Sequence, residues 1–202
     1  GTIKNQMWRS FASTIFVLGT ILILLRGDGA WAQAGRTAPR IEVQKYTIDA
    51  NVNPRTQSIE ATARMDFTAL ENSADATFEL NNALTISKAV DGQGASVQTT
   101  RNPDGTVRAI FPTGLQKSQT AQLAISYDGK LTGNEDSPVS GIRFAALHPD
   151  FGYLLYPARW FPVNGYTTNR FAADLRITVP AGYRVVGSGD LKTDHAAGGG
   201  TI

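Results

Sequence analysis

The feature that most constrains the fold is a strict alternation of apolar and polar residues between positions 45 and 67. In its first half, apolar and polar residues alternate in the order Lys45, Tyr46, Thr47, Ile48, Asp49, Ala50, Asn51 and Val52. In its second half, the apolar positions are Ile59, Ala61, Ala63, Met65 and Phe67. The sequence Asn53-Pro54-Arg55-Thr56 between them has the composition of a turn. Because successive strand side chains point to opposite faces, the pattern predicts a long antiparallel hairpin with one buried face.

The same period continues along the chain. Candidate strands lie at 77–81, 84–90, 95–100, 106–111, 121–127, 171–179 and, returning after Pro180-Ala181-Gly182, at 183–186. Lys88 is the one residue that breaks the alternation of its run. No segment after the first 40 residues has the three- and four-residue spacing of a helix. The sequence therefore predicts an all-β domain, with an antiparallel sheet of sandwich or saddle type.

The segment between Lys130 and Asn169 differs from the rest. It shows little alternation and is rich in aromatic residues: Phe144, Phe151, Tyr153, Tyr156, Trp160, Phe161 and Tyr166. A loop of this length in a compact domain usually has a function or packs on something else. Two interpretations stay open: the rings cap the sheet as part of its core, or they form an interface.

The first 32 residues have the layout of an export signal. Arg9 precedes an uncharged apolar run, Phe11–Leu25, and the small-residue pattern Ala30-Trp31-Ala32 follows it. We expect a cleaved secretory signal, with an uncleaved membrane anchor as the alternative, and an exported protein in the periplasm or outside the cell. Residues 33–40 form a linker. Residues 191–202 form a glycine-rich tail that resembles a chain cut within a hairpin or linker.

Charge and cysteine content exclude several classes of function. The chain has 19 Lys and Arg against 17 Asp and Glu, and the leader supplies Lys4, Arg9, Arg26 and Asp28. The chain after the leader therefore has no net charge and no basic cluster, which argues against a nucleic-acid partner. The chain has no cysteine, so disulfides, thiolate metal sites and cysteine catalysis are excluded.

No catalytic or metal-ligating motif is complete in this sequence. His148 and His195 are the two histidines, and neither has the His-Glu-x-x-His register of a zinc peptidase. Gly187-Ser188-Gly189 has the wrong spacing for a serine nucleophile and is interpreted as a turn. The pair Glu135-Asp136 lies between turn-forming residues and is interpreted as exposed. We therefore predict no catalytic residue and no metal ligand in this chain.

Four segments, in order, resemble the N-terminal β domain of aminopeptidase N-like zinc metallopeptidases, the gluzincin aminopeptidases. They are YTIDANVNPRTQSIEATARMDFTA, FELNNALTISKAVDGQG, LAISYDGKLTG and LLYPARWFPVNGYTTNRFAADLRITVPAGYRVVGSG. The resemblance assigns the β domain to residues 41–190. Three positions depart from the family pattern: Val163-Asn164-Gly165 follows Phe161-Pro162, Arg159 lies one position closer to Phe161-Pro162, and Tyr153 replaces a glutamine or glutamate.

The resemblance implies that this chain is the non-catalytic part of an exported zinc aminopeptidase. In such enzymes the β domain packs on a thermolysin-like domain that holds the zinc and the general-base glutamate, and it forms one wall of the peptide-binding cleft. That catalytic domain, with its zinc, is absent from these residues, so the implied partners are the chain's own C-terminal domain and a peptide substrate. The implied substrate-contact residue is Tyr153, and the implied docking residues are Phe144, Phe151, Tyr156, Arg159, Trp160, Phe161 and Tyr166.

Other functions remain compatible with the sequence. An exported β-sandwich could act as a stand-alone binding module that holds carbohydrate or peptide on exposed aromatic rings. A purely structural adhesion or envelope domain is a third interpretation.

Overall fold

The structure is a computed structural model, and it describes residues 40–134, 139–165, 170–192, 196–197 and 200–201. The chain divides into two compact units, Gly1–Thr37 and Ala38–Ile202. The first unit, with the expected leader, lies outside the described residues. The described fold is that of the second unit. No helix within the described residues is long and apolar enough to span a membrane.

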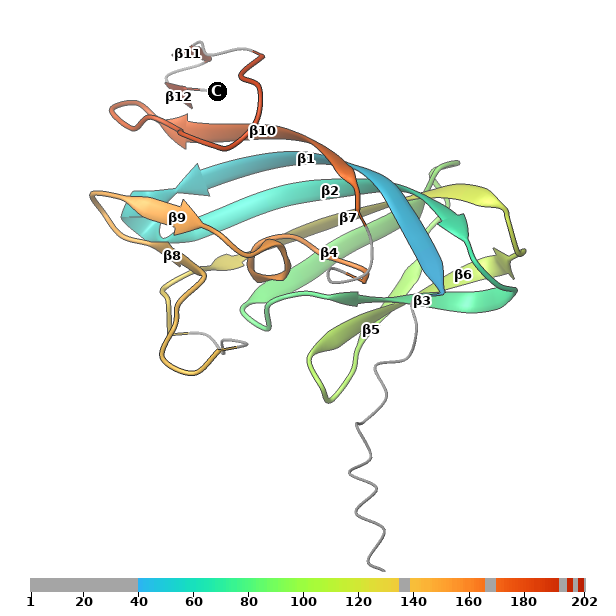
Figure 1. The fold of residues 1–202 in the computed structure, drawn as a ribbon. Helices are drawn as coiled ribbons and strands as arrows, with labels where there is room; N and C mark the ends of the chain where they lie inside the picture. Colours follow the sequence, from blue (N-terminus) through green and yellow to red (C-terminus); the bar gives the residue numbers. More distant parts are fainter. Residues whose placement is uncertain (1–39, 135–138, 166–169, 193–195, 198–199, 202) are drawn as a thin grey trace, which may run out of the picture. The chain divides into compact units, whose positions relative to one another are not determined.

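Strands make up nearly all of the regular structure (Figure 1). The larger sheet has the strand order β11-β12-β10-β1-β2-β7-β4, and the second sheet has the order β3-β6-β5. The strands are β1 (Ile41–Asn53), β2 (Ser58–Ala69), β3 (Ser73–Glu79), β4 (Leu84–Asp91), β5 (Gln98–Arg101), β6 (Thr106–Leu115), β7 (Thr120–Lys130), β8 (Ala145–Leu147), β9 (Gly152–Leu154), β10 (Ala172–Pro180), β11 (Ala196–Ala197) and β12 (Gly200–Thr201). Two 3-10 turns, η1 (Pro54–Thr56) and η2 (Pro157–Arg159), complete the described elements.

The hairpin predicted from the alternation is confirmed. β1 and β2 pair antiparallel from Ile41↔Ala69 to Asn53↔Ser58, and their apolar positions are buried on one face. A register shift between Val43 and Lys45 lets both Val43 and Tyr46 face the core despite their odd spacing. A register shift also explains why Lys88 breaks the alternation of its run. The β4–β7 ladder shifts between Ile86 and Lys88, so Ala89 takes the buried position.

The core lies between the larger sheet and the smaller β3-β6-β5 sheet. The largest fully buried side chains include those of Tyr46, Phe67, Phe78, Ile125 and Tyr127, which come from both sheets. The apolar faces of both sheets thus cover one another, and the all-β prediction is confirmed.

The structure differs from the strand-by-strand expectations in two places. The sheets are antiparallel except at one edge, where β10 runs parallel to β1 from Lys45↔Ala172 to Asn51↔Thr178. A parallel pair needs a long connection, and here residues 54–171, which include β2 to β9, separate β1 from β10. The candidate strand 183–186 is irregular, because Tyr183 and Val185 instead pack against the core and the Tyr183 hydroxyl donates to the Pro149 carbonyl.

The segment expected to be a long loop contains short regular elements. β8 and β9 pair from Ala145↔Leu154 to Leu147↔Gly152 and form a small hairpin, and η2 follows it. β8 is buried at all three positions, so its continuous apolar sequence, Ala145-Ala146-Leu147, gave no alternation to detect.

Candidate domain-docking surface

The β8–β9 hairpin is fixed to the η1 turn by main-chain and side-chain hydrogen bonds. The Leu131 amide donates to the Gln57 carbonyl at 2.8 Å, and the Leu147 amide donates to the Leu131 carbonyl at 2.7 Å. The Gln57 side chain also donates to the Leu147 carbonyl at 2.6 Å. Gln57 ends η1 with φ of 56°, a left-handed conformation that turns the chain from β1 into β2. The hairpin therefore has a defined position on the domain.

The second half of the segment is attached along β3. Glu79 and Val163 form an isolated bridge, with hydrogen bonds of 2.7 and 2.9 Å in the two directions. The Asn81 side chain donates to the Arg159 carbonyl at 3.1 Å, and the Asn164 side chain donates to the Thr77 carbonyl at 2.8 Å. Both asparagines are buried, so each stabilises this attachment by satisfying main-chain groups that water cannot reach.

The inner rings of the segment belong to the core. Trp160 and Phe161 are only 5% and 3% exposed. Phe161 and Phe171 each meet the Tyr46 ring edge-on, at centroid distances of 5.3 and 4.7 Å. The Tyr46 hydroxyl accepts a hydrogen bond from the Asn164 amide at 3.3 Å. Burial raises the pKa of Tyr46 well above its ordinary value, so this phenol is uncharged at neutral pH.

The outer side of the segment carries exposed apolar side chains. Leu155 is 70% exposed and Phe151 is 57% exposed, and Val139 and Ile142 are also exposed. In the same segment, the rings of Phe144 and Tyr156 make a tilted contact at a centroid distance of 5.5 Å, and those of His148 and Phe151 make one at 4.8 Å. We call the four exposed residues Val139, Ile142, Phe151 and Leu155 the 139–155 apolar surface. Half of the large exposed hydrophobic residues of the described chain fall within this short stretch.

The residues implied by the resemblance fall into two groups. Trp160 and Phe161 are buried within the domain, which favours the core interpretation for these two rings. Phe144, Tyr153, Tyr156 and Arg159 are partly buried, and Phe151 is exposed. Tyr153 lies in β9 opposite Ala146, and Tyr166 lies outside the described residues. The docking role of the set and the substrate contact of Tyr153 remain predictions.

Sequence reasoning missed the residues that hold the segment in place. Gln57, Asn81 and Asn164 bond to partners 90, 78 and 87 positions away. Polar residues next to turns are common, and no local signal separates these three from others. The exposed aliphatic residues Val139, Ile142 and Leu155 were also missed, because the docking residues predicted for this segment were aromatic residues and Arg159.

A catalytic zinc site needs a cluster of protein ligands. Within the described part of the chain, no group of three or more His, Cys, Asp or Glu side chains could hold a metal ion. His148 lies in the β8–β9 turn against Phe151, while His195, Glu135 and Asp136 lie outside the described residues. Gly187-Ser188-Gly189 is irregular and exposed.

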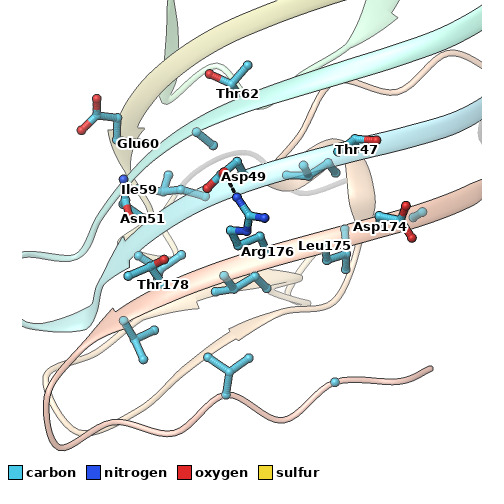
Figure 2. Close-up of a pocket in the computed structure, with 18 of the residues that line it drawn as sticks. Thr47, Asp49, Asn51, Ile59, Glu60, Thr62, Asp174, Leu175, Arg176 and Thr178 are labelled. Atoms are coloured by element: carbon cyan, nitrogen blue, oxygen red, sulfur yellow. Dashed lines mark hydrogen bonds and ion pairs between the residues drawn. The ribbon is translucent and has the colours of Figure 1, made fainter. Parts of the chain in front are cut away.

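A hollow of about 2170 Å³ lies over the polar face of the larger sheet, lined by β1, β2, β7, β10 and residues 184–192 (Figure 2). Two of its charged side chains pair with each other, since Arg176 bonds Asp49 at 3.2 Å, and its Asp174 bonds the neighbouring Lys45 at 2.7 Å. The lining holds hydroxyl, amide and charged groups but no histidine. Thr47, Asp49 and Asn51 of β1 are among the alternating polar positions that line it.

The fold is similar to part of solved M1 zinc metallopeptidases. An M1 zinc metallopeptidase from Deinococcus radiodurans matches with a TM-score of 0.68 and 21% identity, over 80% of this chain and 37% of that chain. A mutant from the same organism, bound to a Tyr-Ser-Ala substrate, matches with a TM-score of 0.68 and 20% identity, over 80% and 38%. A two-domain M1 zinc metallopeptidase mutant bound to L-tryptophan matches with a TM-score of 0.61 and 20% identity, over 80% and 38%.

Neither the protein-family models nor the curated proteins contain a match to this chain. At 20–21% identity the structural likeness establishes the fold. This chain spans less than two fifths of the length of these solved structures. The resemblance predicted from the sequence is thus confirmed for the fold: the chain folds like one part of an M1 zinc metallopeptidase.

Proposed function

We propose that this chain is the non-catalytic N-terminal β domain of an exported zinc metallopeptidase. Its role is to pack on a separate metallopeptidase domain and to form one wall of the peptide-binding cleft. The observation that carries the proposal is the likeness, over 80% of this chain, to about 38% of a zinc metallopeptidase. Zinc and the groups that act on the peptide would belong to the part of the enzyme that this chain does not cover.

The 139–155 apolar surface supports the packing role. Large apolar side chains exposed together on a soluble domain often mark an interaction site. The β8–β9 hairpin, whose turn carries Phe151, is held by the hydrogen bonds of Gln57, Leu131 and Leu147, so little ordering of this hairpin is needed when a partner covers it. We assign this surface to contact with the metallopeptidase domain.

The alternative of a carbohydrate-binding module has less support. Such modules use exposed rings as flat platforms, but Phe151 is the one exposed ring among the described residues. Trp160, the ring best suited to stacking on a sugar, is buried.

The test is to express the complete gene and to compare its product with residues 1–202. We expect the longer protein to contain His-Glu-x-x-His and a downstream glutamate, to bind zinc, and to hydrolyse Tyr-Ser-Ala in a reaction that a chelator stops. The 202-residue chain is the matched control and should bind no stoichiometric zinc. A complete gene that ends at Ile202, or that continues without a zinc motif, would contradict the proposal.

A further inference from the structure

The Arg101 side chain, at the end of β5, donates hydrogen bonds to five oxygen atoms from two other segments of the chain. The acceptors are the carbonyls of Leu80 at 2.9 Å, Asn81 at 3.4 Å, Leu84 at 2.7 Å and Gly105 at 2.8 Å, and the amide oxygen of Asn82 at 3.1 Å. All five oxygens are uncharged, and within the described residues no ion pair joins Arg101 to a carboxylate. Partial burial lowers the pKa of this guanidinium, but an arginine remains charged at neutral pH. The fold therefore binds a cation with carbonyl and amide oxygens.

The two segments that supply these oxygens are the β3–β4 connection, residues 80–84, and the turn 102–105. Within the turn, the Gly105 amide donates to the Asn102 carbonyl at 3.0 Å. Gly105 has a φ of +83°, and a Cβ atom added there would lie 2.9 Å from the Asn82 amide oxygen. Both the backbone conformation and the close approach of the two segments favour glycine at this position. The turn is thus fixed against the β3–β4 connection, and its oxygen has a defined position before any cation binds.

Asn81 connects this site to η2. Its carbonyl accepts from Arg101, its amide donates to the Ala158 carbonyl at 2.9 Å, and its side chain donates to the Arg159 carbonyl at 3.1 Å. Asn81 is 1% exposed, and its side-chain oxygen accepts from the Ala83 amide at 3.1 Å. Each polar group of this buried asparagine therefore has a partner. The position of η2 depends on the conformation of the β3–β4 connection, which the cation fixes.

We infer that the five oxygens form a guanidinium-binding site whose natural occupant is the Arg101 side chain, and that Arg101 positions η2 through Asn81. A guanidinium presents its N–H groups in one rigid plane and can donate to acceptors from two segments at once, whereas an ammonium is a point charge. The consequence for the domain contact rests on the proposed function, since the docking residues Tyr156 and Arg159 lie at η2. The site itself does not, because all of its contacts lie within this chain.

Chemical rescue tests the site. Arg101→Ala leaves the five oxygens without their donor, so the melting temperature of the 202-residue chain should fall. Because Arg101 is exposed to solvent, a small cation can reach the vacated site. Guanidinium chloride at millimolar concentration, far below the molar concentrations that unfold proteins, should raise the melting temperature of this variant by binding its folded state. Sodium chloride and methylammonium chloride at the same ionic strength should not, and the wild type should not respond.

Amide hydrogen exchange tests the link to η2. In Arg101→Ala, the Asn81 amide, which bonds to the Ala158 carbonyl, should exchange about tenfold faster than in the wild type, and guanidinium should restore its protection. Arg101→Lys keeps the charge but loses the planar donor group, so it should resemble Arg101→Ala. Arg64→Ala, at an exposed position of β2, is the matched control and should change neither the exchange nor the response to guanidinium.

Two results would overturn the proposal. One is that guanidinium stabilises Arg101→Ala no more than sodium chloride or methylammonium chloride does, or fails to fold that variant if it is unfolded by itself. The other is that Arg101→Lys protects the Asn81 amide as well as the wild type does. Neither measurement involves zinc binding or peptide hydrolysis by a longer chain, so failure of this proposal and failure of the proposed function are distinguishable.

Discussion

Tyr46 and Tyr127 are both fully buried, but their hydroxyl groups have different surroundings. The Tyr46 hydroxyl accepts a hydrogen bond from the Asn164 amide. Within the described residues, the Tyr127 hydroxyl is buried without a hydrogen-bond partner. A buried hydroxyl that makes no bond loses its hydration without compensation, whereas one that makes a bond recovers part of that loss.

This difference predicts opposite effects of removing each hydroxyl. Tyr46→Phe should lower the free energy of unfolding by about 1–2 kcal/mol, since it leaves the Asn164 amide without its acceptor. Tyr127→Phe keeps the packing and should change stability by less than about 0.5 kcal/mol, or increase it. Urea unfolding at neutral pH measures both. A larger loss from Tyr127→Phe than from Tyr46→Phe would contradict the assignment.

The same two residues predict how stability responds to alkaline pH. Burial raises the pKa of both phenols above the ordinary 10.0, so the unfolded chain releases these protons first. Between the unfolded and folded pKa values the folded state holds more protons, and stability therefore falls as pH rises above 10.0. Each Tyr→Phe variant should make this decline shallower between about pH 10 and pH 11. The Lys45–Asp174 ion pair is present in the wild type and in both variants. It therefore does not contribute to the difference between their pH dependences.

At the scale of elements, β7 approaches the turn before β4 so closely that residue 129 must be glycine. Gly129 lies opposite Leu84 in the β4–β7 ladder. A Cβ atom there would lie 2.1 Å from the Ala83 carbonyl oxygen, and the contact is with backbone, which cannot move aside cheaply.

Gly129→Ala should therefore separate β4 from β7 and lower the free energy of unfolding by about 1–3 kcal/mol. Gly187→Ala is the matched control, since a Cβ atom added at Gly187 would have no other atom within 4 Å, and it should change stability by less than about 0.5 kcal/mol. Thermal or urea unfolding of both variants provides the comparison. Equal stability of the two would show that the turn before β4 is not held against β7.

The elements also show what the sequence could and could not predict. Period-2 alternation located β1, β2 and β7 because each buries one face, and the irregular Lys88 marked a real register shift. Periodicity identifies a strand but not its neighbour, so the parallel pairing of β10 with β1 was not predictable. Residues that act across long sequence distances, such as Gln57 and Asn164, carry no local pattern.

For the whole molecule, the main question is what covers the 139–155 apolar surface. If a metallopeptidase domain normally packs there, the 202-residue chain alone exposes an apolar patch to water. That patch should bind a hydrophobic dye, and Phe151→Ser combined with Leu155→Ser should reduce the binding. Both side chains are already exposed, so the melting temperature should change little.

Val186→Ser is the control for this prediction, since Val186 is exposed but lies apart from the surface in sequence. It should leave dye binding nearly unchanged, because an isolated apolar side chain offers no continuous patch. In a longer chain that carries the proposed metallopeptidase domain, the Phe151→Ser and Leu155→Ser pair should instead weaken the packing of the two domains and speed proteolysis between them. If the pair changes neither dye binding in the short chain nor proteolysis in the long one, the surface is ordinary solvent-facing structure. The proposed packing role of this surface would then be wrong.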